Sequence, residues 1–193
     1  MMTDLIRTAT DLASHMAIQY MMPGDIAIDA TCGNGNDTVK LASAMPEKLY
    51  AFDIQPAAIE NTRNLLISCG FASLLQNDTI RLICDSHENL GSYVKERVGA
   101  VMFNLGYMPG QDKSVTTQSV STLKALTSAL ELLRIGGIIC ITMYSGHTEG
   151  LKEKKDILEW ASGLDNKIFH SAYVSMINQK NSPPEIVFIT RKK

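Results

Sequence analysis

Hydrophobic positions along the chain follow two periods, which predict alternating helices and strands. In residues 4–21, apolar side chains recur every three or four positions, as on one face of an amphipathic helix. Short apolar runs rich in Ile, Val, Leu and Phe predict strands instead. Further helices are predicted over residues 38–44, 57–68, 120–133 and 152–161. Strands are predicted over residues 26–30, 49–53, 80–84, 98–103, 138–143, 167–177 and 185–190.

This order of elements predicts an α/β fold with a mostly parallel seven-stranded sheet. Strands that alternate with helices become parallel neighbours, and the connecting helices cover both faces of the sheet. Only a short polar segment, residues 178–184, joins the last two strands, so we expect a C-terminal antiparallel hairpin at one edge. Gly136 and Gly137 are expected to end the helix before the fifth strand. No repeat or linker interrupts the pattern, which predicts a single domain over residues 1–193.

Composition narrows the class of protein. The chain has 193 residues, of which 45% are hydrophobic and 20% charged, as in ordinary globular domains. No apolar run approaches the roughly 20 residues that cross a membrane, and the N-terminal residues lack a signal-peptide pattern, so we expect a cytoplasmic protein. The net charge of −2 disfavours a protein that coats nucleic acid, but it allows an enzyme with a local basic patch.

The four cysteines do not indicate a metal site. They lack CxxC spacing, which disfavours zinc binding and a disulfide framework. Cys84 and Cys140 lie in predicted strands, where core packing is the expected role. The remaining cysteines are Cys32 and Cys69.

A glycine-rich turn follows the first predicted strand, in the sequence DATCGNGNDT. Glycines there let the backbone approach a ligand closely, and the next helix offers free N–H groups at its start. A dinucleotide-binding fingerprint would place a third glycine at position 38, where this chain has Thr38. The turn therefore favours a ligand without a pyrophosphate over NAD. A tight strand-to-helix turn without a ligand is the structural alternative.

Polar residues also follow the second and third strands. Asp53, about 20 residues beyond the glycine loop, is placed to accept hydrogen bonds from ribose hydroxyls, and Ile54 and Gln55 would border the same pocket. The segment Cys84-Asp85-Ser86-His87 can place polar groups against the edge of an adenine. For His87, a solvated position in a turn is an equally good interpretation.

The segment NLGYMPG, residues 104–110, ends the fourth predicted strand. Turn chemistry explains its glycine and its proline, but it does not require Asn104 and Tyr107. A turn with a packing tyrosine is the structural alternative to a binding site formed by these two residues.

Taken in order, these motifs resemble class I S-adenosylmethionine-dependent methyltransferases. The glycine loop, the acids after strands two and three, and an Asn-x-x-Tyr after strand four follow that family's order. Residues 104–107 resemble the Asn-Pro-Pro-Tyr motif of amino-group methyltransferases, with both prolines replaced. More narrowly, DATCGNGNDT, FDIQ, FNLGYMPG and INQKNSPP resemble a bacterial family first labelled rRNA methylases, whose members have been reassigned as tRNA wobble-uridine methyltransferases.

The resemblance implies a Rossmann-like class I methyltransferase fold and a specific reaction. The implied methyl donor is S-adenosyl-L-methionine, with S-adenosyl-L-homocysteine as product and no metal. The implied substrate is the anticodon stem-loop of tRNA, rather than DNA or a membrane. The 5-aminomethyl group of the wobble uridine, expected to be a 2-thiouridine, would become 5-methylaminomethyl. The residues expected to contact the donor are Asp29, Thr31, Gly33, Asn34, Gly35, Asn36, Asp37, Asp53, Ile54, Gln55, Asp85, Ser86, His87 and Asn104.

The amine acceptor is expected at the end of the fourth strand. The Asn104 side-chain carbonyl and the Leu105 backbone carbonyl can accept hydrogen bonds from an amine and aim its lone pair at the methyl group. Tyr107 would stack on the flipped uracil or wall the pocket, while Gly106 and Pro109 shape the loop. An alkylamine must lose a proton before it attacks.

Two later loops are expected at the same sheet edge. Tyr144 and His147 follow the fifth strand, where Tyr144 would form another wall. His147 is a candidate acceptor of the amine proton because imidazole titrates near neutral pH, although a loop histidine without that role fits equally well. Asn178 and Lys180 lie between the last two strands and are candidates to grip the RNA, with a plain hairpin loop as the alternative.

An RNA substrate also requires positive charge. The candidates are Lys113, Lys152, Lys154, Lys155, Lys180, Arg191, Lys192 and Lys193. On the helix after the fifth strand, lysines mix with acidic residues, and a solvated face is the preferred interpretation there. Because no RNA-binding domain is evident, a homodimer is a hypothesis for holding a stem-loop.

The sequence is compatible with other functions. The acceptor is less well determined than the donor, so methylation of rRNA or of a small amine is the main alternative. A nicotinamide-dependent oxidoreductase would require Thr38 to be tolerated in place of glycine. A binding module that keeps the cofactor pocket without catalysis is a third class.

Overall fold

One sheet organises the residues that the computed structural model describes, which are 7–106, 119–146 and 148–193. The predictions for Tyr107, Pro109, Lys113 and His147 lie outside these residues. None of the helices in the described residues combines the length and the apolar character needed to cross a bilayer.

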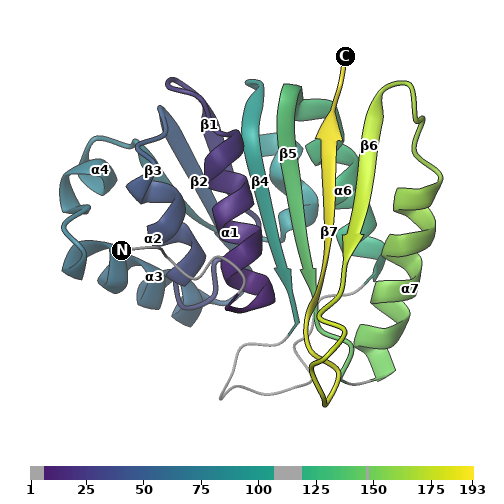
Figure 1. Ribbon diagram of the computed structural model, residues 1–193. Helices are drawn as coiled ribbons and strands as arrows, with labels where there is room; N and C mark the ends of the chain where they lie inside the picture. The colour runs from purple at the N-terminus through teal and green to yellow at the C-terminus, as the bar shows by residue number, and fades with distance from the viewer. Residues whose placement is uncertain (1–6, 107–118, 147) are drawn as a thin grey trace.

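Seven strands form the sheet in the order β3-β2-β1-β4-β5-β7-β6 (Figure 1). Their bounds are β1 (Ile26–Asp29), β2 (Lys48–Asp53), β3 (Ile80–Cys84), β4 (Val98–Leu105), β5 (Leu133–Met143), β6 (Phe169–Val174) and β7 (Glu185–Arg191). β1 to β5 are parallel, whereas β7 is antiparallel to both β5 and β6. The predicted parallel sheet with a C-terminal antiparallel hairpin is therefore confirmed. The strand order switches direction between β1 and β4, which is where open sheets of this kind bind ligands.

Helices cover both faces of this sheet, as predicted. Their bounds are α1 (Ala9–Tyr20), α2 (Asn36–Ser43), α3 (Pro56–Ser68), α4 (Ala72–Gln76), the 3-10 helix η1 (His87–Asn89), α5 (Leu90–Tyr93), α6 (Ser119–Leu132) and α7 (Thr148–Ser162). Figure 1 shows α1 in front of the sheet and α6 behind it. α2, α3 and α4 pack on the face of α1, and α5 and α7 on the face of α6.

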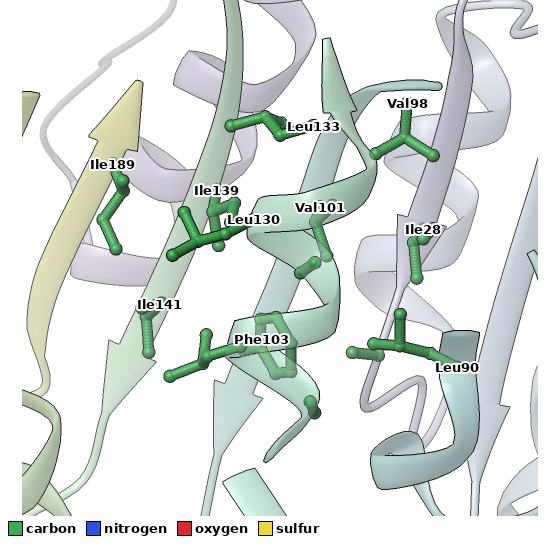
Figure 2. Close-up of a cluster of buried hydrophobic side chains, with 14 of the residues drawn as sticks. Ile28, Leu90, Val98, Val101, Phe103, Leu130, Leu133, Ile139, Ile141 and Ile189 are labelled. Carbon is green, nitrogen blue, oxygen red and sulfur yellow. The ribbon is translucent and has the colours of Figure 1, made fainter. Parts of the chain in front are cut away.

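β4 shows how the strand period builds two cores. Val101 and Phe103 belong to the cluster on the α6 face, which Figure 2 shows, whereas Ala100 and Met102 belong to the cluster on the α1 face. Because successive side chains of a strand point to opposite faces, a strand buried on both sides reads as a continuous apolar run. The same alternation places the next residue, Asn104, on the α1 face at the end of the strand.

The start of β5 differs from the prediction. Gly136 and Gly137 lie inside β5 and do not end the preceding helix, because the chain passes directly from α6 into an extended segment at Leu133. Gly136 has a φ of 72°, and the pairing of β4 with β5 shifts register between Val98 and Ala100. A Cβ atom on Gly137 would lie 3.0 Å from the backbone oxygen of a β4 residue. The glycines therefore serve an irregular strand pairing.

Shorter elements also depart from the predicted bounds. β6 ends at Val174, not at residue 177. The short helices α4, η1 and α5 are not predicted because so few residues cannot show a helical period.

An ion pair at the amino ends of the strands joins α1, the residue before β1, and β5. Arg134 Nε donates to Asp25 Oδ1 at 2.7 Å, and the guanidinium also donates to the backbone oxygen of Tyr20. Burial alone would raise the pKa of Asp25, but hydrogen bonds from Arg134 and from the Met22 N–H outweigh it and lower the pKa. A Cβ atom on Gly99 would lie 2.1 Å from Asp25 Oδ2, so glycine is required opposite this pair.

Arg134→Met is expected to destabilise the protein strongly at neutral pH. It leaves the largely buried Asp25 carboxylate without its charged partner, which typically costs about 3 kcal/mol. Since the folded-state pKa of Asp25 lies below its ordinary value of 3.8, the stabilisation is present above that pH and disappears as the pH falls through the folded-state value. Urea unfolding at pH 7 and pH 3 should show a large penalty that shrinks in acid. Arg63→Met, which removes an exposed pair with Glu60, should have little effect, and an equal loss in both variants would contradict the argument.

Candidate functional site

The candidate site lies at the carboxyl ends of β1, β2 and β4. Asp29 ends β1 and is in register with Ala51 of β2 and Met102 of β4. Asp53 and Asn104 each lie two residues farther along their strands. The three polar residues that the sequence singled out therefore reach the same edge of the sheet, beside the switch point.

The glycine loop after β1 contacts β2 and α3. The Gly33 N–H donates to Asp53 Oδ2 at 3.0 Å, and the Thr62 hydroxyl donates to the Gly33 oxygen at 3.1 Å. Gly35 has a φ of 87°, and a Cβ atom there would lie 2.9 Å from the Thr62 Cα atom. The loop thus requires glycine at position 35 for both its backbone conformation and its contact with α3.

Thr38 explains why the dinucleotide fingerprint is incomplete. Its buried hydroxyl donates to Asp29 Oδ2 at 2.6 Å, and the Thr31 N–H donates to Asp29 Oδ1 at 3.2 Å. A glycine at position 38 would remove one of these bonds from a fully buried carboxyl group. Burial, followed by the nearby charge of Asp37, raises the pKa of Asp29 to about 7.

Asp29→Asn is expected to flatten the dependence of stability on pH. Because the pKa of Asp29 is about 7 in the folded protein and about 4 in an unfolded chain, the folded state binds more protons between these values. The free energy of unfolding therefore falls as the pH rises through this window. Asparagine carries no charge to bury and keeps polar atoms for Thr31 and Thr38. Urea titrations at pH 5 and pH 8 without donor should lose this slope in the variant, which should be the more stable protein at pH 8 by on the order of 2–4 kcal/mol. An unchanged slope would contradict the assignment.

Asp53 and Asp85 differ in their surroundings. Burial raises the pKa of Asp53, against hydrogen bonds from the N–H groups of Gln55, Gly33 and Ile54. The Tyr93 hydroxyl, which donates to Asp85 at 2.8 Å, lowers the pKa of Asp85, and Asn89 adds a further hydrogen bond. Both carboxylates are therefore fixed in orientation. The glycine loop holds Asp53, and Tyr93 and Asn89 hold Asp85.

His87 is not a solvated turn residue, so that alternative is wrong. Its side chain is 8% exposed, and its ring lies edge-on to Phe103 with the centroids 5.9 Å apart. Burial lowers its pKa, although a hydrogen bond with the backbone of Ala30 opposes the shift. The neutral imidazole therefore packs between Phe103 of β4 and the backbone just after β1.

Asn104 has one side-chain atom engaged and one unengaged. Its backbone N–H donates to Thr31 Oγ1 at 2.7 Å, and its side-chain Nδ2 donates to Asp37 Oδ2 at 3.1 Å. Its Oδ1 is buried and has no hydrogen-bond partner among the residues that the structure describes. Buried carbonyl oxygens are usually paired, so an unpaired one at a ligand-binding edge indicates a place for a donor.

A polar network behind Asn104 is not predicted by the sequence. Ser14 donates to Asp37 Oδ1 at 3.0 Å, and Lys40 Nζ lies 3.2 Å from both Asp37 Oδ1 and Asp11 Oδ1. Asp37 is only 7% exposed. The spacing of Asp37 and Lys40 on one helix is visible in the sequence, but the partners on α1 are not, because no local pattern pairs two helices.

Tyr144 lies beside the end of β4. Its ring is the nearest neighbour of Gly106, where a Cβ atom would come within 3.4 Å, and its hydroxyl lies 3.3 Å from Thr10 Oγ1 of α1. The side chain remains 37% exposed. Tyr144 therefore offers an aromatic surface beside Gly106, which lies two residues beyond Asn104. Asn178 and Lys180 are exposed in the β6–β7 loop, whose strands place it at the same edge of the sheet (Figure 1).

The structure separates the basic candidates into groups. Because β7 is antiparallel, Arg191 lies at the opposite sheet edge, where it donates to the Leu133 backbone oxygen at 3.0 Å. Lys192 and Lys193 follow it, so these three candidates for RNA binding lie at the sheet edge away from the candidate site. Lys154 pairs with Glu185 and lies over the Tyr173 ring. The predicted solvated face of α7 is thus correct for the exposed Lys152 and Lys155, but wrong for Lys154.

Comparisons with known sequences identify the family. The sequence profile of the family described as "Putative rRNA methylase" matches residues 49–190. A relative from Arabidopsis thaliana, described as "tRNA (mnm(5)s(2)U34)-methyltransferase, chloroplastic", is 35% identical over 196 residues, which cover 97% of this chain and 70% of the relative.

Comparisons with solved structures agree. A structure from Clostridium thermocellum, titled as an rRNA-methylase, has a TM-score of 0.89 and 39% identity, covering 96% of this chain and 98% of the other. A methyltransferase structure from Streptococcus mutans in complex with SAH has a TM-score of 0.85, 39% identity and the same coverage. The chain therefore belongs to the family described as "Putative rRNA methylase" and has the fold of its S-adenosylmethionine-dependent methyltransferases.

Proposed function

We propose that the protein is an S-adenosylmethionine-dependent N-methyltransferase that converts the 5-aminomethyl group of a tRNA wobble uridine to 5-methylaminomethyl. The substrate class follows the Arabidopsis relative, whose name specifies this uridine. The observation that carries the amine chemistry is the buried Oδ1 of Asn104 at the end of β4, which has no partner among the described residues. An amine donates hydrogen bonds, and this oxygen can only accept them.

The residues after β1, β2 and β3 fit the donor. The two glycines of the Gly33–Gly35 loop carry no side chain, so a ligand can approach the loop backbone closely. Two N–H groups hold the Asp53 carboxylate, which can accept hydrogen bonds from ribose hydroxyls. Asp85 and Ser86 lie one strand farther, at the end of β3, where the adenine would bind. When bound, S-adenosylmethionine supplies a methyl group whose bond to sulfur breaks as the amine lone pair forms the new N–C bond.

The chain's own contribution to this reaction is to position the amine and to stabilise its charge. Asn104 Oδ1 and the Leu105 backbone carbonyl would accept the amine hydrogens and so orient its lone pair. The nitrogen becomes more positive as the new bond forms, and a hydrogen bond to a carbonyl strengthens accordingly. Such an interaction is stronger in the transition state than in the ground state, which is the condition for catalysis. Tyr107 and His147 complete the proposal as a stacking group and a proton acceptor.

The substrate side is proposed to continue over Tyr144 and the β6–β7 loop. Tyr144 presents an exposed ring beside Gly106, and a nucleobase stacks on such a ring with little regard to sequence. Asn178 and Lys180 would contact the RNA backbone. A second protomer would extend this surface, and sedimentation with tRNA tests that homodimer.

Purified protein distinguishes the proposal from its alternatives. Calorimetry should show binding of S-adenosylhomocysteine and none of NAD. With labelled donor, methyl transfer should occur to tRNA carrying 5-aminomethyluridine and be absent with ribosomal RNA, the substrate that the family description suggests. Transfer to rRNA alone would replace the substrate while keeping the donor site, and binding of NAD would overturn both.

A further inference from the structure

The network behind Asn104 assigns a role to Asp37 that goes beyond contact with the donor. Both Asp37 oxygens are engaged within the protein, Oδ1 by Ser14 and Lys40 and Oδ2 by Asn104 Nδ2. A carboxylate can only accept hydrogen bonds. It therefore requires the Asn104 amide to present its NH2 group to Asp37, and the carbonyl oxygen is turned away on the other branch of the same amide.

We propose that Asp37 is a positioning residue that fixes the orientation of the Asn104 amide, and that Lys40 and Ser14 fix Asp37 in turn. The inference rests on the proposed amine methylation and adds a specificity element to it. With the carbonyl oxygen outward, the site accepts a hydrogen-bond donor such as an amine. With the amide reversed, the NH2 group would face the amine, and two donors would confront each other.

The N-terminal helix thereby becomes part of the positioning apparatus. Ser14 and Asp11 lie on α1, whereas Asp37 and Lys40 lie on α2. Lys40 Nζ contacts Asp11, Ser14 and Asp37 at 3.1 to 3.2 Å. Lys40 and Ser14 both lie against Oδ1, although the Ser14 hydroxyl also has the Thr10 backbone oxygen as an acceptor at 2.7 Å. Oδ1 therefore faces Lys40, and Oδ2 accepts from Asn104.

Asp37→Asn tests this directly because the two side chains have the same shape. Lys40 would hold the oxygen of the new amide at position 37, so the NH2 group of that amide would face Asn104 and force the Asn104 amide to reverse. We expect kcat to fall by roughly 10- to 100-fold, with affinity for S-adenosylhomocysteine and the melting temperature little changed. A merely structural role would instead lower the melting temperature and leave the kcat of the folded fraction intact.

A second substitution should restore activity. In the double variant Asp37→Asn with Lys40→Met, nothing cationic holds the oxygen of the new amide, and the Ser14 hydroxyl can donate or accept. The amide at position 37 can then turn its oxygen to Asn104, and we expect most of the lost kcat to return. Lys40→Met alone keeps the carboxylate, which still accepts from the Asn104 NH2 group, so its kcat should fall less than that of Asp37→Asn. A double variant no more active than Asp37→Asn, or an Asp37→Asn enzyme with wild-type kcat, would overturn the proposal.

A measurement on the wild-type protein keeps the test independent of turnover and of how well variants fold. The Asn104 side-chain amide signals in a 1H–15N spectrum are identified by their loss in Asn104→Ala. If the Asn104 NH2 group donates a hydrogen bond to the Asp37 carboxylate, its signals should show slow rotation of the amide and protection from hydrogen exchange. Rapid exchange of these protons with solvent would contradict the proposed orientation of the Asn104 amide. If the wild-type enzyme fails to methylate the tRNA amine, the proposed function falls, and this signal still reports on the orientation.

Discussion

Replacing Asn104 by alanine is expected to reduce methyl transfer to tRNA by about 10³-fold, near the upper end for losing one preorganised electrostatic contact. The variant removes the acceptor oxygen that stabilises the amine as it gains positive charge, and it also removes the group that aims the lone pair. Affinity for S-adenosylhomocysteine should persist, because Gly33, Asp53 and Asp85 are unchanged. Single-turnover methyl transfer from labelled donor measures the rate, and calorimetry measures the affinity for S-adenosylhomocysteine.

Asn166→Ala is the matched control for that variant. Asn166 is exposed in the turn before β6, and β6 begins at the sheet edge opposite the site. The Asn166→Ala variant also loses a side-chain amide, but it leaves β4 unchanged. Its rate of methyl transfer should equal that of the wild-type protein. Equal rates for both variants would remove Asn104 from the mechanism, and loss of donor binding in Asn104→Ala would assign the residue to the donor instead of the amine.

Gly35→Ala is expected to abolish donor binding at ordinary concentrations. The substitution places a Cβ atom 2.9 Å from the Thr62 Cα atom. Both atoms are attached directly to the backbone, so no side-chain rotation can relieve the contact. The loop must therefore move away from α3, which disturbs the Gly33 hydrogen bond to Asp53. Loss of one hydrogen bond to a charged group and displacement of the loop together predict a fall in affinity of at least roughly 100-fold.

Gly70→Ala separates the backbone effect from the contact. Gly70 has a φ of 88°, almost equal to the 87° of Gly35, and a Cβ atom there meets nothing within 4 Å. Both variants should lose about 1–2 kcal/mol of stability from the left-handed backbone, but Gly70→Ala should bind S-adenosylhomocysteine normally. Normal binding by both variants would show that the loop does not form the donor site.

The sequence is most informative where a pattern is local. Apolar runs located the seven strands of the described sheet, and the polar residues after β1, β2 and β4 meet at one edge because parallel strands end together. The burial of His87 could not be predicted, since its environment comes from Phe103 on a different strand. The register shift between Val98 and Ala100 is not predicted either. The glycines beside it meet residues distant in sequence, since a Cβ atom on Gly99 would meet Asp25 and one on Gly137 would meet the Gly99 oxygen.

Long-range polar contacts explain the remaining differences. Lys154 looked like one charge in a mixed-charge helix, yet its partner Glu185 is on β7. Ser14 had no visible role in an amphipathic helix, yet it contacts Asp37 across 23 positions of sequence. Arg191 is a candidate for RNA binding by its charge alone. The direction of β7 places it at the sheet edge opposite the site.

Nucleoside mass spectrometry of total tRNA tests whether the protein methylates the wobble uridine, when a strain that lacks this gene is compared with its parent. We expect the deletion strain to lose 5-methylaminomethyl-uridines and to accumulate the 5-aminomethyl precursor. The wild-type gene should restore the modification, and the Asn104→Ala gene should not. An unchanged tRNA profile would contradict the tRNA assignment and direct the search for the acceptor to rRNA and small amines.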